Sequence, residues 1–177
     1  NNQLINGNIL ASVCGITAGT AQFVTEPWLK FALDGKILFV QKKTYRYGLS
    51  WSHINQGNAV YGNRTIILHG LIYKIRLLKG ALTDPGKDGD FDKGAHGSEW
   101  NRLMLPIHEQ AIDKSWRYPN YVEENVPVWS HNFGTGANGM YTDADLMTLY
   151  IHGDGSYSWC QETRNTDTAR RVVRGGG

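Results

Sequence analysis

Residues 28–40 read WLKFALDGKILFV, two runs of β-prone residues on either side of Asp34-Gly35. Asp-Gly is among the strongest short signals for the two-residue turn of a β-hairpin, because both residues tolerate a positive φ. The stretch therefore predicts a β-hairpin, and it is the element from which the fold class is argued.

A second hairpin is predicted over residues 65–78, which read TIILHGLIYKIRLL. His69-Gly70 interrupts two β-rich runs, and in the second run apolar residues alternate with Lys74 and Arg76. Alternation of this kind predicts strands with one buried face and one face in water.

Two helices are predicted from capping residues and spacing. Ser50 precedes a short amphipathic turn that Gly57 closes. Ser98 begins a second helix, which Pro106 bends or ends, and its apolar residues stand at i, i+3, i+4 and i+7: Trp100, Leu103, Met104 and Ile107. Residues 146–151 and 157–161 are further strand candidates, so the fold class is α+β.

The composition bounds the class of protein. The chain has 177 residues, with 41% hydrophobic and 19% charged residues, which suits one folded domain or a domain with a small appendage. Its apolar runs are strand-sized, so we expect no membrane insertion. Lys and Arg number 18 against 16 Asp and Glu, a net charge of +2 that gives no electrostatic reason to expect nucleic acid as a partner.

The first 27 residues differ from the rest in being poor in charge and rich in small polar side chains. We interpret residues 1–27 as a docking arm and residues 28–177 as the domain proper. The residues near Asn1 include no apolar segment of the kind that marks a signal peptide or a membrane anchor, so we expect neither there.

The two cysteines, Cys14 and Cys160, lie far apart in the sequence and carry no zinc-type spacing. They would form one long-range disulfide if the ends of the chain meet. The alternative is a pair of buried thiols.

An acidic loop offers a candidate calcium site. Asp88, Asp90, Asp92 and Glu99 stand at positions 1, 3, 5 and 12 of an EF-hand-like register. Lys93 occupies the place of the sharp-turn glycine, so the alternative is a solvated, turn-rich loop.

Residues 113–145 form a long stretch without periodicity that is rich in aromatic side chains. Rigid rings interleaved with amides are typical of saccharide-stacking and protein-binding surfaces, although some of these rings would also cover a small core. The candidate ligand-binding residues are Trp116, Arg117, Tyr118, Tyr121, Trp129, Phe133 and Tyr141.

Catalytic motifs are weak. The chain has no Gly-x-Ser-x-Gly elbow and no histidine pair of the HExxH type. Gly134-Thr135-Gly136-Ala137-Asn138-Gly139 has the spacing of a dinucleotide fingerprint without its strand and helix context. An enzyme would use Asp143 and Asp145, or the carboxylates of residues 84–99. A polar strand entry is the better explanation of Asp143 and Asp145. We therefore expect no enzymatic activity.

The order of predicted elements, together with Glu99-Trp100 and the terminal Arg171-Val172-Val173-Arg174-Gly175-Gly176, resembles the C-type-lectin-like fold in its formylglycine-generating-enzyme variant. The likeness covers roughly residues 36 to 177 and extends to bacteriophage tail-fibre and virion proteins that share the fold. It implies twisted antiparallel sheets, one or two short helices and long irregular loops that present ligand contacts. The enzyme branch of this family uses a cysteine pair for oxygen-dependent chemistry, whereas here Cys14 lies outside the matching region and Cys160 stands alone on a predicted strand. The calcium motifs of the sugar-binding branch, Glu-Pro-Asn and Trp-Asn-Asp, are missing.

The resemblance implies a virion structural or adhesion module of a phage, in a tail fibre, tail tip or head decoration. Its expected partners are other virion proteins and a host-surface receptor or glycan, with a homotrimer as the family's common assembly. A purely structural assembly or cement protein is the alternative, and a formylglycine-generating-type or glycan-active enzyme is a weaker one.

Overall fold

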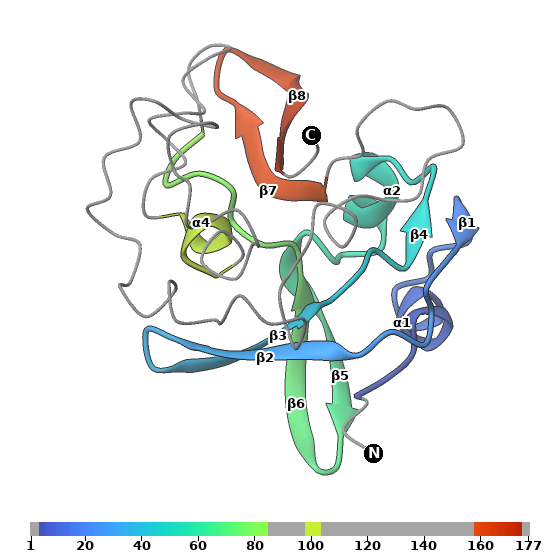
Figure 1. Cartoon of the computed structure of the whole chain (residues 1–177). Coiled ribbons are helices and arrows are strands. Elements are labelled where there is room, and N and C mark those ends of the chain that lie inside the picture. Colours follow the sequence, from blue (N-terminus) through green and yellow to red (C-terminus); the bar gives the residue numbers. More distant parts are fainter. Residues whose placement is uncertain (1–3, 85–97, 104–157, 175–177) are drawn as a thin grey trace, which may run out of the picture. The chain divides into compact units, whose positions relative to one another are not determined.

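The computed structural model describes residues 4–84, 98–103 and 158–174, which form two compact units (Figure 1). Among the described residues, the first unit comprises 4–77 together with Ser158, and the second comprises 78–84, 98–103 and 159–174.

The first unit consists of short helices and two-stranded antiparallel sheets. β1 pairs with β4, β2 with β3 and β5 with β6. The elements are α1 Gly7–Val13, β1 Thr20–Ala21, β2 Trp28–Leu33, β3 Lys36–Gln41, β4 Arg46–Tyr47, α2 Trp51–Gln56, β5 Tyr61–Leu68 and β6 Leu71–Arg76.

The first predicted hairpin, β2–β3, is confirmed, with Leu33 opposite Lys36 and Trp28 opposite Gln41. Its turn residues have φ angles of 50° at Asp34 and 73° at Gly35. Two successive positive φ values are the geometry that makes Asp-Gly favourable at this place.

The second predicted hairpin, β5–β6, is also confirmed, and His69 (φ 51°) and Gly70 (φ 79°) form its turn. The pairing shifts by a bulge between Tyr61 and Arg64, where Gly62 has a φ of 86°. A glycine is needed there because an L side chain rarely adopts this conformation.

The helix α2 begins after Ser50, as its sequence predicted. The Ser50 side chain accepts a hydrogen bond from the His53 N–H, and the His53 ring bonds back to Ser50, which makes a capping box. Gly57 is the C-cap residue, and Trp51 and Ile54 are buried. The local signal and the observed helix agree residue for residue.

The helix α1 was not expected within the proposed arm. Asn6 caps it by accepting a hydrogen bond from the Ile9 N–H, and a Cβ added at Gly7 would lie 2.6 Å from the Tyr45 side chain. The Trp28 indole N–H donates to the Ile5 carbonyl at 2.8 Å, and its ring meets Tyr45 edge to face. Residues 4–24 therefore pack on residues 28–77 through specific contacts, while the division of the chain at residue 27 stays a prediction.

The second unit contains α4 Glu99–Leu103 and the strands β7 Ser158–Arg164 and β8 Asp167–Arg174, which form a two-stranded sheet around the Asn165-Thr166 turn. The predicted start of a helix after Ser98 and a strand near residue 160 are confirmed. Its buried apolar residues are Ala81, Trp100, Leu103, Cys160 and Val172.

The α+β class is thus confirmed by short helices and antiparallel two-stranded sheets. No helix in the described part of the chain is long and apolar enough to cross a membrane. The strand candidate at residues 146–151 and the continuation of α4 past Leu103 lie outside the described residues.

Candidate interaction surface

All the candidate ligand-binding residues fall outside the ranges that the structure describes, and so do three of the four carboxylates proposed for calcium. They stay predictions from the sequence. They are Trp116, Arg117, Tyr118, Tyr121, Trp129, Phe133 and Tyr141 for ligand binding, and Asp88, Asp90 and Asp92 for metal.

Glu99, the fourth carboxylate of the EF-hand-like register, is described and has a structural contact. Its Oε2 accepts a 3.0 Å hydrogen bond from the Lys79 N–H, while the Trp100 N–H donates to the Lys79 carbonyl. Within residues 4–84, 98–103 and 158–174, no group of three His, Cys, Asp or Glu side chains is placed to hold a metal ion.

Two more carboxylates hold residues 78–84 against β7. Glu162 Oε2 accepts a 2.9 Å hydrogen bond from the Gly80 N–H, and Asp84 Oδ1 accepts one of 3.0 Å from the Thr163 N–H. Burial raises the pKa of Glu162, the negative charge of Asp84 adds to that rise, and backbone N–H groups oppose it. We interpret both carboxylates as structural, because each accepts a hydrogen bond from the backbone of its own unit.

Cys160 lies in the core of the second unit, with no exposed surface. A Cβ built on Gly80 would lie 2.5 Å from its Sγ and 3.0 Å from Val172 Cγ1. Only glycine therefore fits at position 80 without a rearrangement, and the thiol is sealed beneath this backbone.

Both cysteines are buried thiols, so of the two interpretations left open by the sequence the structure shows the second. Burial raises the pKa of Cys14, and the nearby positive charge of Arg64 opposes the rise. A buried thiol with a raised pKa is a poor nucleophile, because the thiolate is the reactive form.

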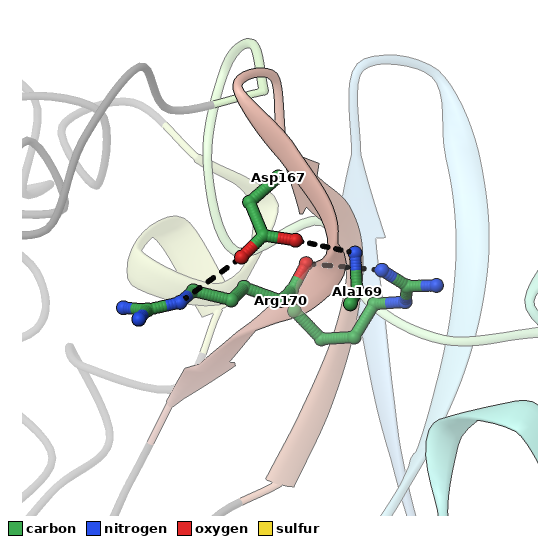
Figure 2. Close-up of polar contacts among 4 residues, drawn as sticks. Asp167, Ala169 and Arg170 are labelled. Carbon is green, nitrogen blue, oxygen red and sulfur yellow. Dashed lines mark hydrogen bonds and ion pairs between the residues drawn. The ribbon is translucent and has the colours of Figure 1, made fainter.

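At the β7–β8 turn, Asp167 orders the first residues of β8 (Figure 2). Its Oδ1 accepts a 3.0 Å hydrogen bond from the Ala169 N–H, and its Oδ2 lies 3.3 Å from Arg170 Nε. Figure 2 shows Asp167 between these two groups, close to the turn. The Arg170 ion pair is exposed, so its contribution to stability is small.

The most unusual surface in the first unit is one face of the β5–β6 hairpin, which we call the outer face. In the strand register Ile67 lies opposite Ile72, and Thr65 lies opposite Lys74. Ile67 and Ile72 are 70% and 71% exposed, and Thr65 and Lys74 are exposed as well. Two isoleucines that are paired across a hairpin and mostly exposed to water form an apolar patch on an accessible strand pair.

The opposite face of the same hairpin packs within the unit. Tyr73 meets Phe39 of β3 edge to face, with ring centroids 5.9 Å apart, where Figure 1 shows the β2–β3 hairpin crossing β5–β6. On this face Ile66, Leu68 and Ile75 are half-buried, whereas Leu71 beside the turn is 61% exposed. The predicted alternation is confirmed in part: the face with Tyr73 is half-buried rather than buried, and the wet face carries isoleucines.

The sequence offered only an ambiguous signal for the outer face. Ile66-Ile67-Leu68 is apolar on both sides of the strand, so periodicity does not say which member faces water. Exposure of Ile67 follows only from where Tyr73 meets Phe39, which is a tertiary contact.

No protein-family model, no curated protein and no solved structure matches the chain.

Proposed function

We propose that this chain is a non-enzymatic structural and adhesion module of a bacteriophage virion, with a C-type-lectin-like fold. In this proposal residues 113–145 contact a host-surface receptor or glycan through their aromatic side chains, and residues 1–27 dock the module on other virion proteins or on sister subunits of a homotrimer. The support is the resemblance stated above together with the surface chemistry of the first unit.

The observation that carries an interaction role is the exposed pair Ile67 and Ile72. Large apolar side chains side by side on a strand pair mark surfaces that a partner covers. A module of a particle has such partners, because its subunits meet neighbours over large areas.

The redox-enzyme alternative is disfavoured by the place of Cys160. Oxygen-dependent thiol chemistry requires a thiol that substrate can reach, and Cys160 is wholly buried against Gly80 and Val172. Its burial agrees with the role of a small apolar core residue.

A purely structural assembly role is the second candidate, and the outer face of the β5–β6 hairpin favours it. That face belongs to the described part of the chain and has the chemistry of an interface core, whichever contact residues 113–145 make. Assembly and host binding are compatible roles for one virion module.

The test is binding of the purified chain to intact candidate host bacteria, with the wild type beside Trp116→Ala/Trp129→Ala. We expect saturable binding that the double variant loses while its circular dichroism spectrum is unchanged. Tyr61→Phe, an exposed aromatic change outside residues 113–145, is the matched control and should bind as the wild type does. Equal binding by wild type and double variant would contradict the host-contact role.

A further inference from the structure

The chain's charges are distributed unevenly, although its net charge is small. Residues 35–83 contain eight Lys or Arg residues and no Asp or Glu. The run is 49 residues long, and it includes the whole β5–β6 hairpin, with Arg64, Lys74 and Arg76 as its cations. The outer face therefore has no carboxylate of its own hairpin to neutralise Lys74.

Several of these cations already serve the unit itself. Arg46 donates to the carbonyls of residues 17–19, Arg64 donates to the Gly57 carbonyl, and Lys43 lies over the Phe23 ring. Lys74, by contrast, is exposed on the outer face beside Ile72. The face thus combines an apolar centre with a cation at its margin.

We propose that the outer face of the β5–β6 hairpin, formed by Thr65, Ile67, Ile72 and Lys74, is a docking surface for an acidic protein partner. The partner presents an apolar strip to Ile67 and Ile72 and carboxylates to Lys74. An apolar centre within a polar rim is the usual anatomy of a protein interface, and complementary charge at the rim contributes to partner choice.

A second copy of this chain is a poor occupant of the face by symmetric pairing. A two-fold contact brings the same patch against itself, so each Lys74 would meet a hairpin that has cations and no carboxylates. Like charges facing each other at a rim oppose association.

Nucleic acid is a poor occupant for a different reason. Phosphate contacts use clustered Lys and Arg with polar donors, whereas the centre of this face is a pair of isoleucines. A phosphate backbone offers no apolar surface to cover the two isoleucines, whereas apolar side chains of a protein partner would remove them from water.

This inference rests on the proposed role as an interaction module but not on host contact by residues 113–145. The two are tested with different variants and different probes. Loss of host binding in the tryptophan variant says nothing about the hairpin, and the converse also holds.

The probe is a synthetic peptide of six Glu-Val repeats, tethered sparsely to a biosensor surface so that its copies do not pair with one another. The full chain is passed over it, beside a matched Lys-Val peptide. We expect binding to the Glu-Val peptide that weakens as salt rises from ~50 to ~500 mM, and no binding to the Lys-Val peptide.

Two variants of the face should weaken this binding. Ile67→Thr/Ile72→Thr keeps β-branched residues in the strands and should lower affinity at least ~10-fold, since it removes the apolar centre. Lys74→Gln should lower affinity ~2- to 5-fold at low salt and reduce the salt dependence. Ile37→Thr, at a 58% exposed position on β3 away from this face, is the matched control and should bind like the wild type.

Three outcomes would overturn the proposal. Equal binding to the Glu-Val and Lys-Val peptides, or binding to neither, would show that the face does not select an acidic partner. Tighter binding to a double-stranded DNA oligonucleotide that Lys74→Gln weakens would assign the face to nucleic acid. Self-association in sedimentation that Ile67→Thr/Ile72→Thr abolishes would assign it to a second copy. Lys74→Gln keeps the test valid if the double variant does not fold.

Discussion

Glu162 and Gly80 are 82 positions apart in the chain, and the Glu162 carboxylate accepts a 2.9 Å hydrogen bond from the Gly80 N–H. This contact ties β7 to the segment that enters the second unit. It uses a buried acid, whose ionised form is costly to desolvate. The pKa of Glu162 is raised chiefly by burial and further by Asp84.

The raised pKa of Glu162 predicts how stability depends on pH. The native state binds the proton more tightly than the unfolded chain, so the free energy of unfolding falls as pH rises from the ordinary value of 4.5 through the raised native pKa, and then levels off. Glu162→Gln cannot ionise, so this part of the dependence should vanish. Urea denaturation at a series of pH values measures how the free energy of unfolding of the wild type and of Glu162→Gln changes with pH.

The control for this prediction is Asp167→Asn, a carboxylate at the partly exposed turn of the same hairpin. The free energy of unfolding of this variant should fall with rising pH above the ordinary Glu pKa, as that of the wild type does. A Glu162→Gln variant that declines as steeply as the wild type would refute the assignment to Glu162.

Gly80→Ala should destabilise the second unit by about 1–3 kcal/mol, because the new methyl group overlaps Cys160 and Val172. Adding Cys160→Ala removes the Sγ nearest to that methyl group and should restore part of the loss. Denaturant unfolding of the two single variants and the double variant forms a mutant cycle. Strictly additive losses would show that the two side chains do not collide.

Tyr45→Phe should lower the free energy of unfolding by about 1–2 kcal/mol, because the hydroxyl of this buried residue donates a 2.7 Å, part-buried hydrogen bond to the Glu26 carbonyl. Burial, and then the charge of Glu26, raise the pKa of Tyr45 to about 12. Stability linked to this group is therefore present below pH 10 and is lost as pH rises through about 12.

Absorbance at alkaline pH tests the Tyr45 assignment. The difference between the wild-type and Tyr45→Phe titrations should show one phenol that ionises near pH 12. Tyr61→Phe, at a 53% exposed ring, is the comparison variant and should leave that late step in place. A difference curve centred at the ordinary phenol value of 10 would contradict the prediction.

Arg46→Ala should loosen the chain that follows α1. The Arg46 guanidinium donates to the Ala18 carbonyl at 2.9 Å and to the Gly19 carbonyl at 2.8 Å, so the variant leaves both acceptors without this donor. We expect faster cleavage by a broad-specificity protease between Cys14 and Gln22. Arg46→Lys has a single ammonium group in place of the planar guanidinium, and its cleavage rate should lie between those of the wild type and the alanine variant. Unchanged cleavage rates would show that β1 and β4 hold this segment without Arg46.

The elements that the sequence predicted well are those whose cause is local. Asp34-Gly35 and His69-Gly70 specify their turns through backbone conformations available to these residues, and Ser50 specifies the start of α2 through one hydrogen bond. In each case the deciding residues lie within a few positions of the element they define. Nothing distant was needed to place them.

The elements that the sequence missed depend on distant contacts. α1 begins with Gly7, a weak helix former, and its place is set by the Tyr45 ring and by a hydrogen bond from the Gly7 N–H to the Val24 carbonyl. The structural role of Glu162 could not be predicted from the sequence, because its hydrogen-bond partner, Gly80, is 82 positions away. The candidate contacts in residues 113–145 and the Asp88, Asp90 and Asp92 site stay predictions, because they lie beyond the part of the chain that the structure describes.

The wide sequence separation of Gly80 and Glu162 has a consequence for the order of folding. The hairpins of the first unit close turns of two residues, whereas the second unit must close a loop of some eighty residues before Glu162 finds Gly80. During synthesis, residues 4–77 leave the ribosome and can pair well before β7 exists. We therefore expect residues 4–77 to fold early, and β7 to bind the segment around Gly80 only after β7 itself has been synthesised.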